Sequence, residues 1–104
     1  YFVAGLTSCL MTQVRAFSKR LRIDIRDVKI YCRCAWTAEM KGRGPYVSAP
    51  KSIDMDIEID SDESQEDIRR LIDAARKGCF IEQMLSVPNE IGHRLKVGDD
   101  WVAV

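Results

Sequence analysis

The chain has 104 residues, 46% of them apolar, and its 16 basic and 16 acidic residues leave a formal net charge of zero. This length and apolar content are enough for one core, so we expect a single domain over residues 1–104. A neutral chain gives no electrostatic reason to expect a nucleic acid or an acidic membrane as partner.

The amino-terminal apolar stretch predicts neither a membrane span nor a signal peptide, because it is short, interrupted by polar residues and not preceded by a basic flank. The chain begins on Tyr1-Phe2-Val3-Ala4 without a capping residue, so we expect it to start inside an element, with a segment removed or belonging to a longer protein. Four cysteines in a chain with long periodic helices and few loops favour reduced thiols and a cytoplasmic location over a secreted disulfide scaffold.

Taken in chain order, the first predicted element is a helix from about Phe2 to Arg20. Its apolar residues recur at helical spacing and basic residues gather near its end, where they suit the helix dipole. A strand from about Arg26 to Ala38 follows, because apolar and polar residues alternate with a period of two. Its predicted inner face comprises Val28, Ile30, Cys32, Cys34 and Trp36.

Gly42-Arg43-Gly44-Pro45 interrupts this alternation, which then resumes in a second strand. Its apolar positions are Ile53, Met55, Ile57 and Ile59, and the acidic residues Asp54, Asp56, Glu58 and Asp60 alternate with them. We expect the two strands to pair as an antiparallel hairpin with a long connection, with the acidic residues on the solvated face.

A second long helix is predicted over Gln65–Lys77, because Ser64 and the acidic residues after it resemble a capping box. Gly78 can end this helix, and Cys79–Leu85 then indicates a shorter helical piece. Ile91–Val97 alternates as a further strand, and Gly98-Asp99-Asp100 can turn the chain into residues 101–104.

This order of elements predicts an α+β fold in which two main helices pack on one face of a mostly antiparallel sheet. The apolar faces of the helices and strands are expected to meet in one core. The predicted core residues are Leu10, Val14, Ile30, Ile57, Ile68, Leu71 and Ile72.

Three segments together resemble the OsmC/Ohr family of hydroperoxide-reducing proteins. They are Gly5-Leu6-Thr7-Ser8-Cys9-Leu10-Met11 at the start of a long helix, Ile25-Arg26-Asp27-Val28 leading into a strand, and Gly78-Cys79-Phe80-Ile81-Glu82-Gln83-Met84-Leu85. The separation of the two cysteines, with a hairpin and a helix between them, is similar to the pattern of that family. The resemblance implies an OsmC-like α+β fold that lacks the amino-terminal strands of the family.

By this resemblance Cys9 matches the peroxidatic cysteine and Cys79 the resolving cysteine. The implied reaction reduces an organic hydroperoxide through a sulfenic acid and a disulfide, and an external dithiol regenerates the thiols. The family also implies an intertwined homodimer, and an activating arginine with its orienting carboxylate in strands ahead of this chain. No residue here matches those two, and Arg15 points to a different side of the helix from Cys9.

Alternatives to this chemistry remain open. Free cysteines are often simply buried, and an OsmC-like domain can also be a non-catalytic dimeric module that binds a small molecule or a partner. Cys32 and Cys34 fit core filling better than a metal pair, and the lone His93 fits a hydrogen-bonded or half-exposed position. The alternating acidic run fits a solvated strand face better than a calcium loop, so no metal or cofactor is expected.

Overall fold

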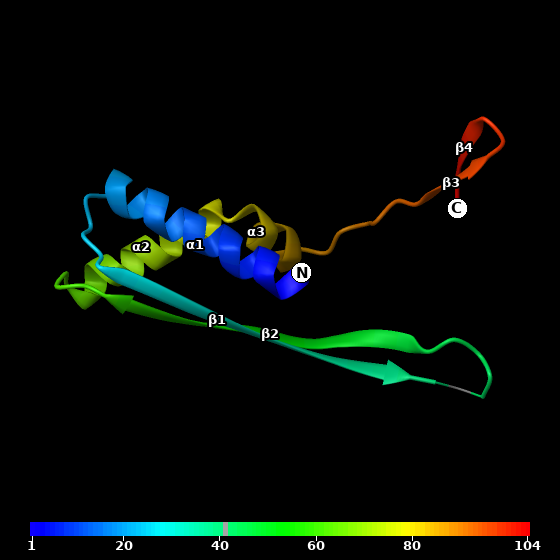
Figure 1. Cartoon of the computed structure of the whole chain (residues 1–104), viewed down its shortest axis with the longest axis horizontal. Helices are drawn as coiled ribbons and strands as arrows, with labels where there is room; N and C mark the ends of the chain where they lie inside the picture. Colours follow the sequence, from blue (N-terminus) through cyan, green and yellow to red (C-terminus); the bar gives the residue numbers. More distant parts are fainter. Residues whose placement is uncertain (41) are drawn as a thin grey trace.

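The computed structural model describes residues 1–40 and 42–104 of the chain. The elements, in order, are α1 (Phe2–Arg20), β1 (Asp27–Glu39), β2 (Val47–Asp60), α2 (Gln65–Gly78), α3 (Phe80–Ser86), β3 (Arg94–Val97) and β4 (Asp100–Ala103). Figure 1 shows the helices lying along one face of the long β1–β2 hairpin, as the α+β prediction requires.

Helix α1 forms where the sequence predicts it, because its apolar residues return to one face every three or four positions. Leu6, Leu10 and Val14 are fully buried on that face, which packs mainly against α2 and also against β1 and α3. Leu21 still donates to the carbonyl of Phe17 at 2.8 Å, and the chain leaves the helix at Arg22, whose φ is 56°.

Strands β1 and β2 pair antiparallel, with Ile30 opposite Ile57. The predicted alternation holds in the half of the hairpin that the helices cover, where Ile57 is half-buried and Asp56 and Glu58 are exposed. Strand β2 begins at Val47, before its regular alternation begins at Ile53. The pairing register shifts between Ala35 and Trp36 on the opposite strand, which interrupts the alternation.

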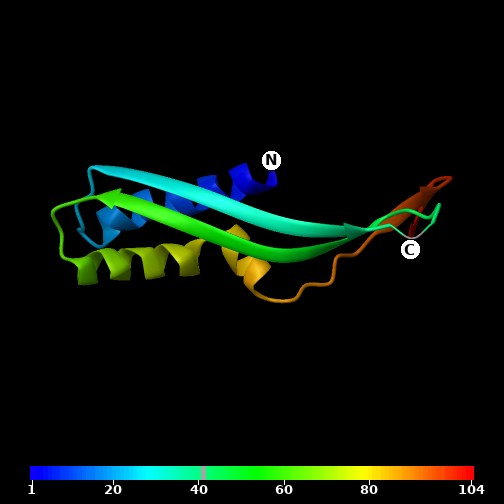
Figure 2. The same cartoon turned by 90° about the horizontal axis from the view of Figure 1, so that it is seen from below.

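The outer half of this hairpin extends past the helices (Figure 2). Trp36 lies there and is 56% exposed, so its predicted burial is wrong. The physical reason is that Trp36 lies beyond the helices, where the Phe2 ring at the start of α1 packs edge-to-face with it at a centroid distance of 6.4 Å and leaves most of the indole exposed.

Helix α2 begins as the capping pattern predicts, because the Ser64 side chain accepts from the backbone N–H of Asp67 at 3.1 Å. The buried apolar residues are Leu6, Leu10, Val14, Ile23, Val28, Leu71, Ala75 and Cys79. Of the predicted core residues, Ile30, Ile57 and Ile68 lie half-buried against this core, and Ile72 borders a cavity described below.

The carboxyl-terminal hairpin of β3 and β4 turns at Gly98, whose φ of 62° suits a glycine. Figure 1 shows it at the end of an extended segment, away from the helices. Leu95 and Val97 are each 56% exposed, because among the described residues no other helix or strand packs on this hairpin.

The two projecting hairpins make the chain elongated. Its radius of gyration is 19.0 Å, whereas a compact domain of about 100 residues has a radius of about 13 Å. No helix within the described ranges is long and apolar enough to cross a membrane.

Candidate functional site

The two cysteines that the sequence singles out meet where α1 packs against the junction of α2 and α3. Cys9 is half-buried on α1, and Cys79 is fully buried as the single residue between α2 and α3. The structure brings their thiols, 70 residues apart in sequence, close enough for each to shift the pKa of the other.

The pKa of the Cys9 thiol lies below its ordinary value. The main cause is hydrogen bonding of its sulfur to the backbone of Ile81, and the Cys79 thiol and the backbone of Phe80 act in the same direction against the cost of burial. A thiolate is the nucleophilic form of cysteine, so this environment favours reaction at Cys9.

The pKa of Cys79 is shifted in the opposite direction. Burial raises it most, and the neighbouring Cys9 raises it further, although the backbone of Glu82 and Ile81 stabilises its thiolate. The pair therefore combines a more acidic, partly accessible thiol with a less acidic, inaccessible one.

The junction that holds Cys79 is fixed by close packing and by backbone hydrogen bonds. Gly78 sits against the ring of Phe17 on α1, and a Cβ atom there would lie 2.7 Å from Phe17 Cε2. The Gln83 side chain donates to the carbonyl of Arg76 at 2.9 Å, which ties α3 to the end of α2. A glycine that caps a helix often has a positive φ, but the φ of Gly78 is not positive. The glycine is therefore needed here for the close approach of the two helices.

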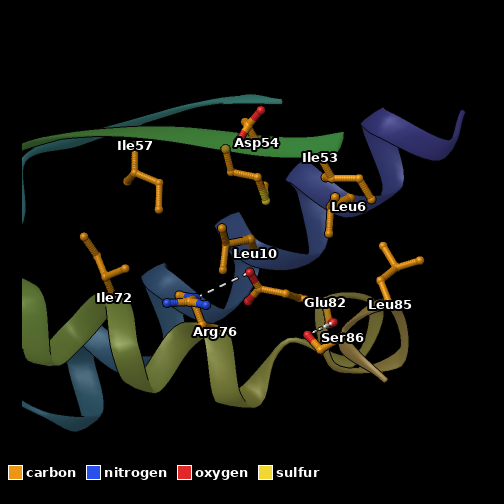
Figure 3. A pocket seen from close by; sticks show the side chains of 11 residues that line it. Leu6, Leu10, Ile53, Asp54, Ile57, Ile72, Arg76, Glu82, Leu85 and Ser86 are labelled. Atoms are coloured by element: carbon orange, nitrogen blue, oxygen red, sulfur yellow. Dashed lines mark hydrogen bonds and ion pairs between the residues drawn. The ribbon is translucent and has the colours of Figure 1, made fainter. Parts of the chain in front are cut away.

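A cavity of about 450 Å³ lies next to this junction, between the helices and β2 (Figure 3). Its apolar wall includes Leu6, Leu10, Ile57 and Ile72. The lining residues also include Ile53, Asp54, Met55, Arg76, Glu82, Leu85 and Ser86.

Glu82 gives this cavity a polar corner. One carboxylate oxygen lies 3.5 Å from Arg76 Nε, and the other, Oε2, is buried without a hydrogen-bond partner among the described residues. Polar residues on a helix surface usually contact only water. Glu82 and Gln83 instead each contact Arg76, through its side chain and its carbonyl respectively.

The other sequence candidates lie elsewhere. Cys32 and Cys34 are half-buried on β1 with their sulfurs 3.8 Å apart, and His93 is exposed before β3. All four cysteines are free thiols. Across residues 1–40 and 42–104, no group of three or more His, Cys, Asp and Glu side chains is placed to hold a metal ion.

The backbone groups of Phe80 and Ile81 are the part of the site that the sequence reasoning missed. Cys9 lies too deep in α1 to use the amides at the start of its own helix, and the structure supplies those at the start of another. The signal was present in the short helical piece after Cys79, because the first amides of any helix lack partners within it.

Comparison with known proteins identifies the class. The family described as OsmC-like protein matches residues 1–94, which is most of the chain. An OsmC-like hydroperoxide resistance protein from Jannaschia sp. CCS1 is similar in structure with a TM-score of 0.93 and 47% sequence identity, over 99% of this chain and 68% of that one. The chain belongs to the OsmC-like family.

Two more distant structures share the fold. An organic hydroperoxide resistance protein OsmC from Legionella pneumophila has a TM-score of 0.61 and 15% identity, over 81% of this chain and 57% of that one. An OsmC-like protein of unknown function from Vibrio cholerae has a TM-score of 0.57 and 18% identity, over 86% and 56%. The chain therefore spans little more than half the length of these two proteins. No curated protein matches it.

Proposed function

We propose that this chain carries the cysteine pair of a thiol peroxidase that reduces organic hydroperoxides. The observation that carries the proposal is the position of Cys9, whose pKa is lowered by the backbone of Ile81 and whose sulfur lies beside the Cys79 thiol. The similarity to a hydroperoxide resistance protein at 47% identity supports the choice of substrate class.

In the first step the Cys9 thiolate attacks the terminal oxygen of the hydroperoxide. The O–O bond breaks, a sulfenic acid forms on Cys9, and the alkoxide leaves as the alcohol after taking a proton from solvent. The hydrogen bonds from backbone groups that lower the pKa of Cys9 maintain the attacking thiolate.

In the second step the Cys79 sulfur attacks the sulfenic acid sulfur. A disulfide forms, and the hydroxyl leaves as water with the thiol proton of Cys79. An external dithiol then reduces the disulfide and is itself oxidised, which restores both thiols. Burial of Cys79 suits this role, because a resolving thiol needs access to Cys9 and not to the substrate.

We propose further that the protein is a homodimer in a reducing compartment such as the cytoplasm. The support is the elongated shape, with a radius of gyration of 19.0 Å, and the exposed Tyr1, Phe2 and Trp36 where α1 begins. A chain of this shape leaves apolar surface that a second copy can bury across a two-fold axis.

The second candidate function is a non-catalytic module that binds a small molecule. The cavity of about 450 Å³ favours it, because an apolar wall with a few polar side chains, among them Glu82, is typical of ligand pockets. In this alternative the thiols are incidental.

A peroxidase assay separates the two. We expect the chain to consume cumene hydroperoxide with dithiothreitol as reductant, Cys9→Ser to abolish the reaction, and Cys79→Ser to leave a sulfenic acid on Cys9 that dimedone traps. Cys32→Ser is the matched control and retains the wild-type rate. Equal rates in the wild-type protein and Cys9→Ser would reject the peroxidase and favour the binding module.

A further inference from the structure

A second group of sulfur atoms lies on the hairpin, apart from the Cys9–Cys79 pair. Cys32 and Cys34 share the half-buried face of β1, and their Sγ atoms are 3.8 Å apart. Met55 on β2 is the direct cross-strand partner of Cys32, so its side chain leaves the sheet on the same face. Three sulfur-bearing side chains are thus neighbours on one surface.

The geometry of Cys32 and Cys34 suits a bridging ion better than a disulfide. Residues two apart on a strand have Cα atoms about 6.6 Å apart, near the upper limit of about 6.8 Å for a disulfide. Two thiolates that bind one metal ion with bonds of about 2.3 Å at trigonal or tetrahedral angles lie about 3.8–4.0 Å apart. The observed distance of 3.8 Å between the two Sγ atoms lies within this range.

The ligand set selects a soft ion. No third His, Cys, Asp or Glu joins the two thiols in the part of the chain that the structure describes, so a hard or borderline ion lacks its usual ligands. The thioether of Met55 is the nearest candidate by strand register, and thiolate with thioether is the combination that favours Cu(I).

We propose that Cys32, Cys34 and Met55 form a binding site for Cu(I) on the inner face of the β1–β2 hairpin. Binding replaces the two thiol protons, which pass to the buffer as two sulfur–copper bonds form, and no atom changes its oxidation state. This inference does not depend on the proposed peroxidase, because none of its three residues takes part in that reaction.

The test measures Cu(I) bound anaerobically in competition with bicinchoninate, in protein carrying Cys9→Ser and Cys79→Ala so that the other thiol pair cannot contribute. We expect one Cu(I) per chain and a sulfur-only shell of three ligands by X-ray absorption. Cys32→Val with Cys34→Val removes the bound copper. Met55→Leu reduces the number of sulfur ligands to two and lowers the affinity for Cu(I), so that bicinchoninate removes more of the copper.

Ile53→Leu is the matched control, because Ile53 is the cross-strand partner of Cys34 and carries no sulfur. It keeps the copper and the three-sulfur shell. Copper retained in the double valine variant, an unchanged shell in Met55→Leu, or complete retention of the copper by bicinchoninate in the parent protein would each overturn the proposal.

Discussion

Gly78 at the end of α2 lies so close to Phe17 of α1 that a Cβ atom at Gly78 would come within 2.7 Å of Phe17 Cε2 and 2.8 Å of Cζ. This contact sets how near α2 approaches α1, and Cys79 is the next residue along the chain. The distance between the two thiols therefore depends on a glycine that carries no functional group.

Gly78→Ala is expected to destabilise the protein by about 1 kcal/mol. Overpacking against Phe17 costs roughly 1–3 kcal/mol, and the gain from replacing glycine in a helix, about 0.5–1 kcal/mol, offsets only part of it. Urea unfolding measures the change. In Phe17→Leu protein the same alanine should cost less, and an equal cost in both backgrounds would show that Phe17 does not set the spacing.

The helices were the most predictable part of the fold, because their patterns are local. The bounds of α1 at Phe2 and Arg20 and the Ser64 cap of α2 follow from apolar spacing and capping chemistry within one segment. What the sequence could not show depended on the surroundings. Trp36 and Leu95 are exposed because, within residues 1–40 and 42–104, no helix covers the outer ends of the hairpins.

The candidate site could be predicted only in part, because it also depends on how the helices pack. The family resemblance pointed to Cys9 and Cys79, but the lowered pKa of Cys9 depends on contacts with the backbone of Phe80 and Ile81. Those contacts exist only once α3 is packed against α1. The local sequence could show that the first amides of α3 would lack partners within the helix. It could not show that they would contact the sulfur of Cys9.

The shifted pKa values predict selective alkylation. At a pH below the ordinary pKa of a cysteine, iodoacetamide should modify Cys9 faster than Cys32 or Cys79, because the pKa of Cys9 is lowered and those of the others are raised. The rate at Cys9 rises with pH as its thiol ionises and then levels off.

In Cys79→Ala protein the midpoint of this profile should move to higher pH, because the thiolate loses its hydrogen bond from Cys79. Cys34→Val is the control and leaves the midpoint unchanged. Mass spectrometry of the alkylated peptides gives both rates, and faster modification of Cys32 than of Cys9 would contradict the site as described.

The ion pairs of Arg26 with Asp60 and Asp62, each 2.7 Å long, predict an acid-sensitive contribution to stability. Hydrogen bonding to Arg26 lowers the pKa of both carboxyl groups. A lowered carboxyl pKa gives stability that is present above the unfolded pKa, about 3.9, and is lost as pH falls through the folded value.

Arg26→Gln should therefore be less stable than the wild-type protein at neutral pH, and the difference should vanish as pH falls below the lowered values. Urea midpoints between pH 7 and pH 2 measure it. Because these groups are exposed, about 1 M salt should also shrink the neutral-pH difference. A difference that persists in acid would mean that Arg26 acts through packing.

Ser64→Ala is expected to cost about 1 kcal/mol, because the N–H of Asp67 loses its acceptor at the start of α2. Ser64→Asp supplies another acceptor and should retain most of the stability. Thermal unfolding of the three proteins measures the effect. If the aspartate variant were as unstable as the alanine variant, the cap would not be the cause.

The central claim is that Cys9 and Cys79 form one redox pair, and the pairing of thiols after a single peroxide treatment tests it most directly. The reduced protein is mixed with one equivalent of cumene hydroperoxide, the remaining thiols are alkylated, and the peptides are mapped by mass spectrometry. We predict a disulfide between Cys9 and Cys79, with Cys32 and Cys34 recovered as alkylated thiols. Recovery of all four cysteines in alkylated form, or a disulfide between any other pair, would contradict the account.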